Sequence, residues 1–151
     1  MRTLSVMQPW SWLLTNIDPK TGKAFKQVEN RDWRYDPKPA MYGPLLVHAG
    51  KKIDRDGYNW VRETYPDIPL PGLKELETGG IVGLTIFTDC VRGCAGDLPD
   101  PFFFGPLGLI MKEGRGLKFF ECKGQLGFFD VTYPHPLSME SVKIWELWAK
   151  S

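Results

Sequence analysis

The chain has few cysteines, almost no net charge and no long apolar run, and each of these absences excludes a class of protein. Three cysteines in 151 residues cannot all pair within the chain. With no signal peptide at the start, they predict a reducing, cytoplasmic location. The 19 basic and 18 acidic residues give a net charge of +1, which excludes strongly basic, histone-like nucleic-acid binding. The apolar runs are too short to cross a bilayer, so we expect no membrane association.

Common enzyme and metal signatures are also missing. The sequence has no P-loop, no dinucleotide-binding fingerprint and no Gly-x-Ser-x-Gly elbow. Cys90 and Cys94 stand four residues apart and would need Cys122 and a histidine to complete a zinc site. Neither His48 nor His135 has a spacing typical of zinc ligands, so ordinary free cysteines are the preferred interpretation. We therefore expect no metal and no cofactor.

Glycine and proline, in contrast, are plentiful, with 16 and 13 residues. They favour many turns between short strands. Helices are predicted after Pro9, over 54–65 and over 138–150. Strands are predicted over 3–6, 27–32, 44–49, 80–91, 102–111, 117–121 and 126–131. The sequence thus predicts one α+β domain over 1–151, a small closed mixed β-barrel with flanking helices.

The segment 28–33, VENRDW, has the densest polar chemistry in the chain. Strand alternation places Glu29 and Arg31 on one face and Asn30 on the other. One interpretation is a surface ion pair of little energetic value. Trp33, and Trp10 from the preceding apolar segment, favour the alternative of a cleft in which nucleic-acid bases stack.

The apolar segment 43–51, GPLLVHAGK, ends in polar residues whose role the sequence leaves open. His48 is either a hydrogen-bonded, partly buried residue or a general base. Lys51 either lies in a solvated turn or contacts a phosphate. Further basic residues, which could converge with Lys51, are Lys112, Arg115, Lys118 and Lys123.

These segments occur in a familiar order. LSVMQPWSWLL, VENRDW and GPLLVHAGKK are followed by GGIVGLTIFTDCV, FFFGPLGLIM and FFECKGQLGFFDV. Over 4–131 the chain resembles the ASCH (activating signal cointegrator homology) domains, especially their small, stand-alone bacterial and phage members. The resemblance implies a PUA-like barrel beside a cleft that binds RNA or a nucleotide, with DNA as the second option and protein partners open. The cleft residues that it implies are Gln8, Pro9, Trp10, Lys26, Glu29, Asn30, Arg31, Trp33, His48, Lys51, Gly124, Leu126 and Gly127.

One departure from the family limits what the resemblance implies about activity. Some relatives hydrolyse 4-acetylcytidine with a lysine, a threonine and a glutamate, and the threonine would fall at Glu29. That activity is therefore not carried over. The loop before Glu29 is also longer than usual, with Lys26 in place of the lysine of the family's short Gly-x-Lys turn.

Three functions remain. A binding module for RNA or a nucleotide is preferred. The second is a hydrolase of single-stranded RNA or a modified nucleoside. In it, Glu29 would be the acid or base, Lys51 or Lys26 the electrostatic stabiliser or nucleophile activator, and His48 a second proton-transfer group. The third is a protein-interaction adaptor that uses Trp145 and Trp148 of the final helix, although these rings would also serve to cover one end of the barrel.

Overall fold

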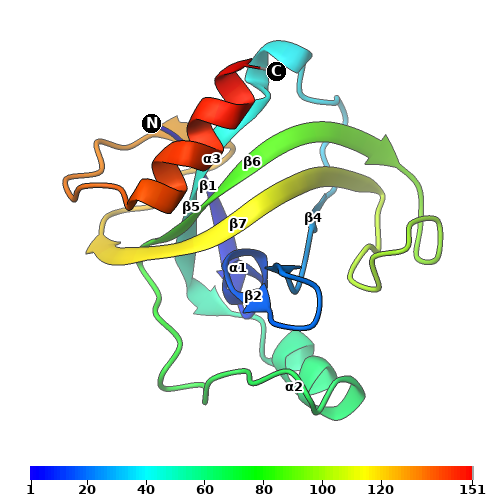
Figure 1. The fold of residues 1–151 in the computed structure, drawn as a ribbon. Coiled ribbons are helices and arrows are strands. Elements are labelled where there is room, and N and C mark those ends of the chain that lie inside the picture. Colours follow the sequence, from blue (N-terminus) through cyan, green and yellow to red (C-terminus); the bar gives the residue numbers. More distant parts are fainter. Residues whose placement is uncertain (151) are drawn as a thin grey trace.

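The structure is a computed structural model that describes residues 1–150, so only Ser151 of the predicted domain lies outside it. Strands and helices are mixed along the chain, as expected for an α+β protein (Figure 1). Within the described residues, no helix has the length and apolar character that a membrane span requires. The elements are β1 (Arg2–Gln8), α1 (Trp10–Thr15), β2 (Ile17–Asp18), β3 (Lys23–Ala24), β4 (Val28–Arg31), η1 (Pro39–Met41), β5 (Gly43–Ile53), α2 (Arg55–Thr64), β6 (Gly80–Arg92), β7 (Leu107–Glu121), β8 (Phe128–Asp130) and α3 (Met139–Lys150).

Six strands form one mixed sheet in the order β4-β7-β6-β5-β1-β8. The β1–β5 pair is parallel and sets Ser5 beside His48, whereas the other pairs are antiparallel. The two outer strands, β4 and β8, do not pair with each other, so a closed barrel is not confirmed. Side chains connect these two outer strands instead. Trp33 lies just beyond the end of β4 and Phe128 lies in β8, and their ring centres are 5.5 Å apart.

The C-terminal half of the sheet differs from the predicted strands. β7 is one 15-residue strand that follows β6 through three register shifts, rather than two strands divided near Glu113. The segment 102–106 is a loop and not the start of a strand, because part of its main chain hydrogen-bonds to the Asn30 side chain. The three register shifts let the glycine-rich strand β7 bend while it stays paired with β6.

Helix α1 packs directly on the sheet and lies beneath the arch of β6 and β7 in Figure 1. Gly83 and Gly114 permit this approach, because a Cβ at either position would overlap Thr15 or the carbonyl of Leu14. The main core forms between the helix and the sheet around Leu14, Val47 and Phe87. This packing fixes the start of α1, where Trp10 lies.

Helix α2 is attached through a second apolar cluster that includes Leu13 of α1 and Tyr58 and Val61 of α2. Asp54 caps the helix by accepting a hydrogen bond from the main-chain N–H of Gly57 at 2.9 Å. Glycine at position 57 weakens the helix but leaves room for the Trp10 ring, which a Cβ would overlap. The helix predicted over 54–65 is thus present, and its unfavourable glycine is explained by packing.

Helix α3 lies against the opposite end of the sheet (Figure 1). Its Ile144 is buried, and a Cβ at Gly43 of β5 would lie 3.1 Å from the Trp148 ring nitrogen. Trp145 keeps 36% of its surface exposed. One of the two tryptophans considered for an adaptor role therefore packs on the sheet.

Candidate functional site

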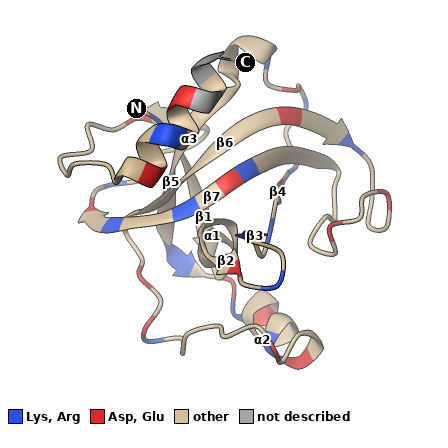
Figure 2. Cartoon of the chain, viewed as in Figure 1, with Lys and Arg blue, Asp and Glu red and all other residues tan. Residues whose placement is uncertain are grey.

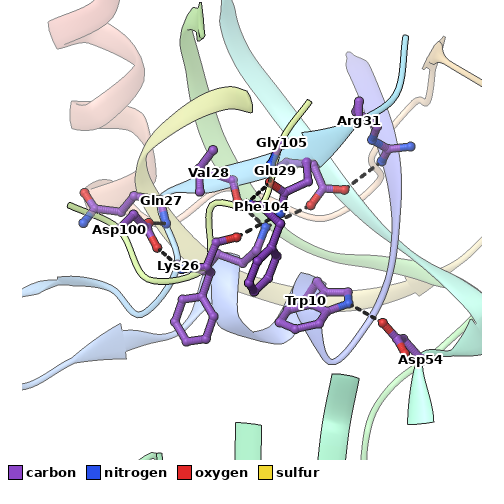
Figure 3. A network of polar contacts seen from close by, with 12 residues as sticks. Trp10, Lys26, Gln27, Val28, Glu29, Arg31, Asp54, Asp100, Phe104 and Gly105 are labelled. Atoms are coloured by element: carbon purple, nitrogen blue, oxygen red, sulfur yellow. Dashed lines mark hydrogen bonds and ion pairs between the residues drawn. The ribbon is translucent and has the colours of Figure 1, made fainter. Parts of the chain in front are cut away.

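A buried ion network surrounds Glu29 at the outer strand β4 (Figure 3). The Lys26 Nζ lies 3.0 Å from one carboxylate oxygen of Glu29 and also donates to the carbonyl of Val28. The Arg31 Nη2 lies 3.0 Å from the other carboxylate oxygen. The predicted alternation is therefore confirmed: Glu29 and Arg31 share a face. Because the Lys26 side chain is 1% exposed and that of Glu29 9%, this is not a weak surface pair.

Arg31 also connects β4 to β1. Its Nη2 donates to the carbonyl of Ser5 at 2.6 Å, and its guanidinium lies 5.6 Å from the centre of the Trp33 ring. Its Nε is buried and has no hydrogen-bond partner among the described residues. The guanidinium is thus held in place through Nη2, and its buried Nε is left without a partner among the described residues.

Trp10 is fixed on three sides. Its Nε1 donates to Asp54 at 3.0 Å, and its ring packs on Gly57. Its ring also contacts Phe104 edge to face, at 6.5 Å between centres. The Lys26 ammonium lies 5.8 Å from the Trp10 ring centre, so the network and the aromatic group are contiguous.

These groups line a cavity of about 330 Å³, which we call the Glu29 cavity. Two apolar side chains on its wall, Met7 and Phe104, are more than 40% exposed. Its lining residues are Ser5, Met7, Trp10, Glu29, Asn30, Arg31, Asp54 and Phe104. The cavity thus combines aromatic and apolar walls with hydrogen-bonding groups in fixed positions.

Asn30 holds part of the wall of the Glu29 cavity in position. Its Nδ2 donates to the carbonyl of Phe102 at 2.9 Å, and its Oδ1 accepts from the main-chain N–H groups of Phe104 and Gly105 at 2.8 and 3.1 Å. Both ends of the amide are therefore engaged. Asn30 positions the loop that carries Phe104.

His48 and Lys51 line a different cavity, of about 280 Å³, which we call the His48 cavity. The His48 Nδ1 lies 2.9 Å from the Ser5 hydroxyl, and its Nε2 lies 2.8 Å from the carbonyl of Cys122. Because a carbonyl only accepts, the His48 Nε2 donates this hydrogen bond. The lining residues are Ser5, His48, Gly50, Lys51, Gly79, Cys122, Lys123 and Gly124. Ser5 therefore belongs to both cavities.

Cys122 contributes its carbonyl to this arrangement, and its thiol is not a ready nucleophile. Burial, the largest effect, raises the pKa of the Cys122 thiol above its ordinary value, although a main-chain hydrogen bond to Ile81 acts in the opposite direction. A raised pKa leaves the thiol protonated at neutral pH.

The remaining residues of the predicted cleft lie elsewhere. Gln8 is buried, donates to the carbonyl of Glu77 at 2.8 Å and accepts from the main-chain N–H of Trp12 at 3.0 Å, so it supports the start of α1. Pro9 is buried between β1 and α1. Leu126 is fully exposed. Trp33 and Gly127 line a separate shallow groove with Tyr35, Asp36, Pro37, Met41 and Phe128.

The basic residues of the C-terminal half have different surroundings. Figure 2 shows basic and acidic positions together along β7, where Arg115 contacts Glu140 at 2.7 Å and Glu113 at 3.5 Å. Lys123, in contrast, joins Lys51 at the His48 cavity. Ser5, Met7, Asp54 and Phe104 were not among the predicted cleft residues, although Asp54 was recognisable as a helix cap. Lys123 was named only as a basic residue that could converge with Lys51.

The chain was also compared with known proteins. No family model and no curated protein sequence matches it. The crystal structure of ASCH from Zymomonas mobilis is similar in fold, with 12% identity, coverage of 97% of this chain and 94% of that chain, and a TM-score of 0.50. Two single-residue variants of that protein superpose with TM-scores of 0.49, at 10% and 12% identity, again over 97% of this chain and over 94% and 96% of theirs. The chain thus has an ASCH-like fold.

Proposed function

We propose that the protein binds single-stranded RNA or a nucleotide, with one base in the Glu29 cavity. The observation that carries this proposal is the wall of Trp10 and Phe104 beside the polar pair of Glu29 and Arg31. The ASCH-like fold supports it, because the sequence resemblance to ASCH domains implies the same class of ligand.

The chemistry of a base suits this cavity. A base has a flat apolar face and a hydrogen-bonding edge, and unpaired bases are bound by stacking on aromatic side chains and by contacts to that edge. Trp10 and Phe104 supply aromatic surface at the wall. The Glu29 carboxylate accepts from amino and imino groups of the base, and the Arg31 guanidinium donates to its carbonyl and ring nitrogens.

The test is fluorescence anisotropy of short labelled RNA at low and moderate salt. We expect Arg31→Ala to weaken binding about tenfold or more, because it removes a charged hydrogen-bond donor. Trp10→Ala removes the stacking surface and should lower affinity by a similar factor. Arg34→Ala is the matched control, since Arg34 is exposed and its guanidinium lies over Tyr35, outside the Glu29 cavity.

Two outcomes would refute the proposal. One is the absence of RNA binding at low salt, and the other is an equal loss of affinity for Arg31→Ala and Arg34→Ala. DNA of the same sequence is titrated in parallel. A preference for RNA identifies the 2′-hydroxyl as part of the recognition.

A hydrolase of single-stranded RNA or of a modified nucleoside is the second candidate. The specific observation is the Glu29 carboxylate at the cavity wall, in contact with the buried ammonium of Lys26. Glu29 would be the acid or base and Lys26 the neighbouring amine. Lys51 and His48 line the other cavity and would take part only with a substrate that spans both.

Labelled RNA and acylated cytidines test this candidate. Wild-type protein should convert one of them, and Glu29→Gln should lose turnover by at least about a hundredfold while retaining measurable binding. Equal turnover, or its absence in both proteins, removes the candidate and leaves the binding proposal intact.

A further inference from the structure

We propose that the His48 cavity binds a phosphate group and that it holds the phosphate of the nucleotide whose base lies in the Glu29 cavity. The base half of this inference rests on the proposed function. The phosphate half stands on the geometry of the His48 cavity and can be tested without it.

The two cavities differ in charge. Acidic and basic groups both line the Glu29 cavity, where Glu29 and Asp54 lie near Arg31 and the buried Lys26. The His48 cavity has Lys51 and Lys123 on its wall and no carboxylate among its lining residues. A charge-balanced cavity suits an uncharged base, whereas a cationic cavity suits an anion.

Lys51 and Lys123 are free to meet an anion. Both are exposed, and neither forms an ion pair with any residue in the described range 1–150. Arg115, on the same long strand β7, is instead held by Glu140 and Glu113. Among the described residues, therefore, no carboxylate lines this cavity or forms an ion pair with either of its lysines.

The fold brings the two lysines together through His48. Lys51 lies in β5, whereas Lys123 follows β7, and the bond from the His48 Nε2 to the carbonyl of Cys122 joins the two segments. Gly124 then passes close to the His48 ring, on the side that faces the Ser5 hydroxyl. A Cβ at Gly124 would lie 2.8 Å from the His48 ring and 3.2 Å from the Ser5 hydroxyl. His48 is thus a positioning residue that holds Lys123 opposite Lys51.

Ser5 links the two cavities. Its carbonyl accepts from Arg31 on the side of the Glu29 cavity, and its hydroxyl contacts His48 on the other side. The two hollows are therefore neighbours across one residue of β1. A nucleotide likewise joins an uncharged base to an anionic phosphate within one molecule, so the proposal assigns its base to one cavity and its phosphate to the other.

The experiment compares the four nucleosides with their 5′-monophosphates by calorimetric or NMR titration. Lys51→Gln/Lys123→Gln removes both cavity lysines. Lys52→Gln/Lys118→Gln is the matched control, with the same loss of charge at exposed residues that do not line the cavity. In wild type and control, we expect the best-bound monophosphate to exceed its nucleoside in affinity by about tenfold or more. In the cavity variant this ratio should fall to near one.

Inorganic phosphate serves as an independent probe. It should shift the amide resonances of Lys51, Lys123 and Gly124 in wild type and not in the cavity variant. Phosphate shifts without nucleoside or nucleotide binding would retain the phosphate site and refute the proposed function. Two results would overturn the phosphate site and leave the proposed function standing. One is that nucleosides bind as tightly as their monophosphates. The other is that both double variants lose affinity for the monophosphate by the same factor.

Discussion

Replacement of Lys26 by methionine tests whether the ion network at β4 is a buried charge pair. The side chain is 1% exposed and its ammonium contacts both the Glu29 carboxylate and the carbonyl of Val28. Methionine fills similar space but leaves Glu29 with Arg31 as its only ionic partner among the described residues, and it leaves the carbonyl of Val28 without this donor. Loss of one partner from a buried ion pair lowers the free energy of unfolding by about 3–5 kcal/mol. Because Arg31 still pairs with Glu29, we expect a loss at the lower end, about 3 kcal/mol.

The measurement is urea and thermal unfolding. For a chain of this size, a loss of about 3 kcal/mol lowers Tm by roughly 6–12 °C. Lys23→Met is the control, because Lys23 is exposed and forms no ion pair with any residue of the described chain; we expect it to change the free energy of unfolding by less than about 0.5 kcal/mol.

A double-mutant cycle separates the ion pair from general disruption. Lys26→Met and Glu29→Gln should be non-additive by about 2 kcal/mol, since either change removes the same interaction. Additive losses, or a loss for Lys26→Met no larger than that for Lys23→Met, would show that the network does not stabilise this strand as its geometry indicates.

Three further predictions concern positions outside this ion network. Asn30→Ala should lower the free energy of unfolding by about 2 kcal/mol and speed hydrogen exchange in the loop 102–105, because three hydrogen bonds are lost; unchanged exchange there would contradict the positioning role. Gly83→Ala should cost more than about 2 kcal/mol in urea unfolding, because its methyl group would overlap Thr15; a neutral result would show that α1 shifts freely. The pKa of the exposed Cys94 thiol is raised by a hydrogen bond to Asp97 and, to a lesser extent, by the negative charge of Asp97. Asp97→Asn should therefore lower the pH midpoint of Cys94 alkylation, measured with the other cysteines replaced by serine. A higher midpoint would contradict this assignment.

Local sequence pattern predicted much of this fold. The apolar, β-branched run 80–91 became β6, and the cap at Asp54 began α2. Strand alternation correctly placed Glu29 and Arg31 on one face. These features depend on neighbours in sequence, and periodicity reports such neighbours well.

Contacts between residues far apart in the sequence could not be predicted from the local pattern. Lysine is ordinarily exposed, so nothing near Lys26 indicates that its ammonium is buried beside Trp10. The proximity of Ser5 and His48 depends on a parallel pairing between strands separated by α1 and β4. Glycines suggested a break between 111 and 117, yet β7 continues because β6 supplies hydrogen bonds along its length.

The pairing of β1 with both β5 and β8 has a consequence for the order of folding. β1 is formed by residues 2–8, but its antiparallel neighbour β8 comes from residues 128–130. Contacts between such distant segments slow folding, because a long loop must close before they form. During synthesis, β1 therefore has one edge unpaired until residues 128–130 have left the ribosome. The His48 cavity, which needs residues 122–124 beside Ser5, is assembled only at this late stage.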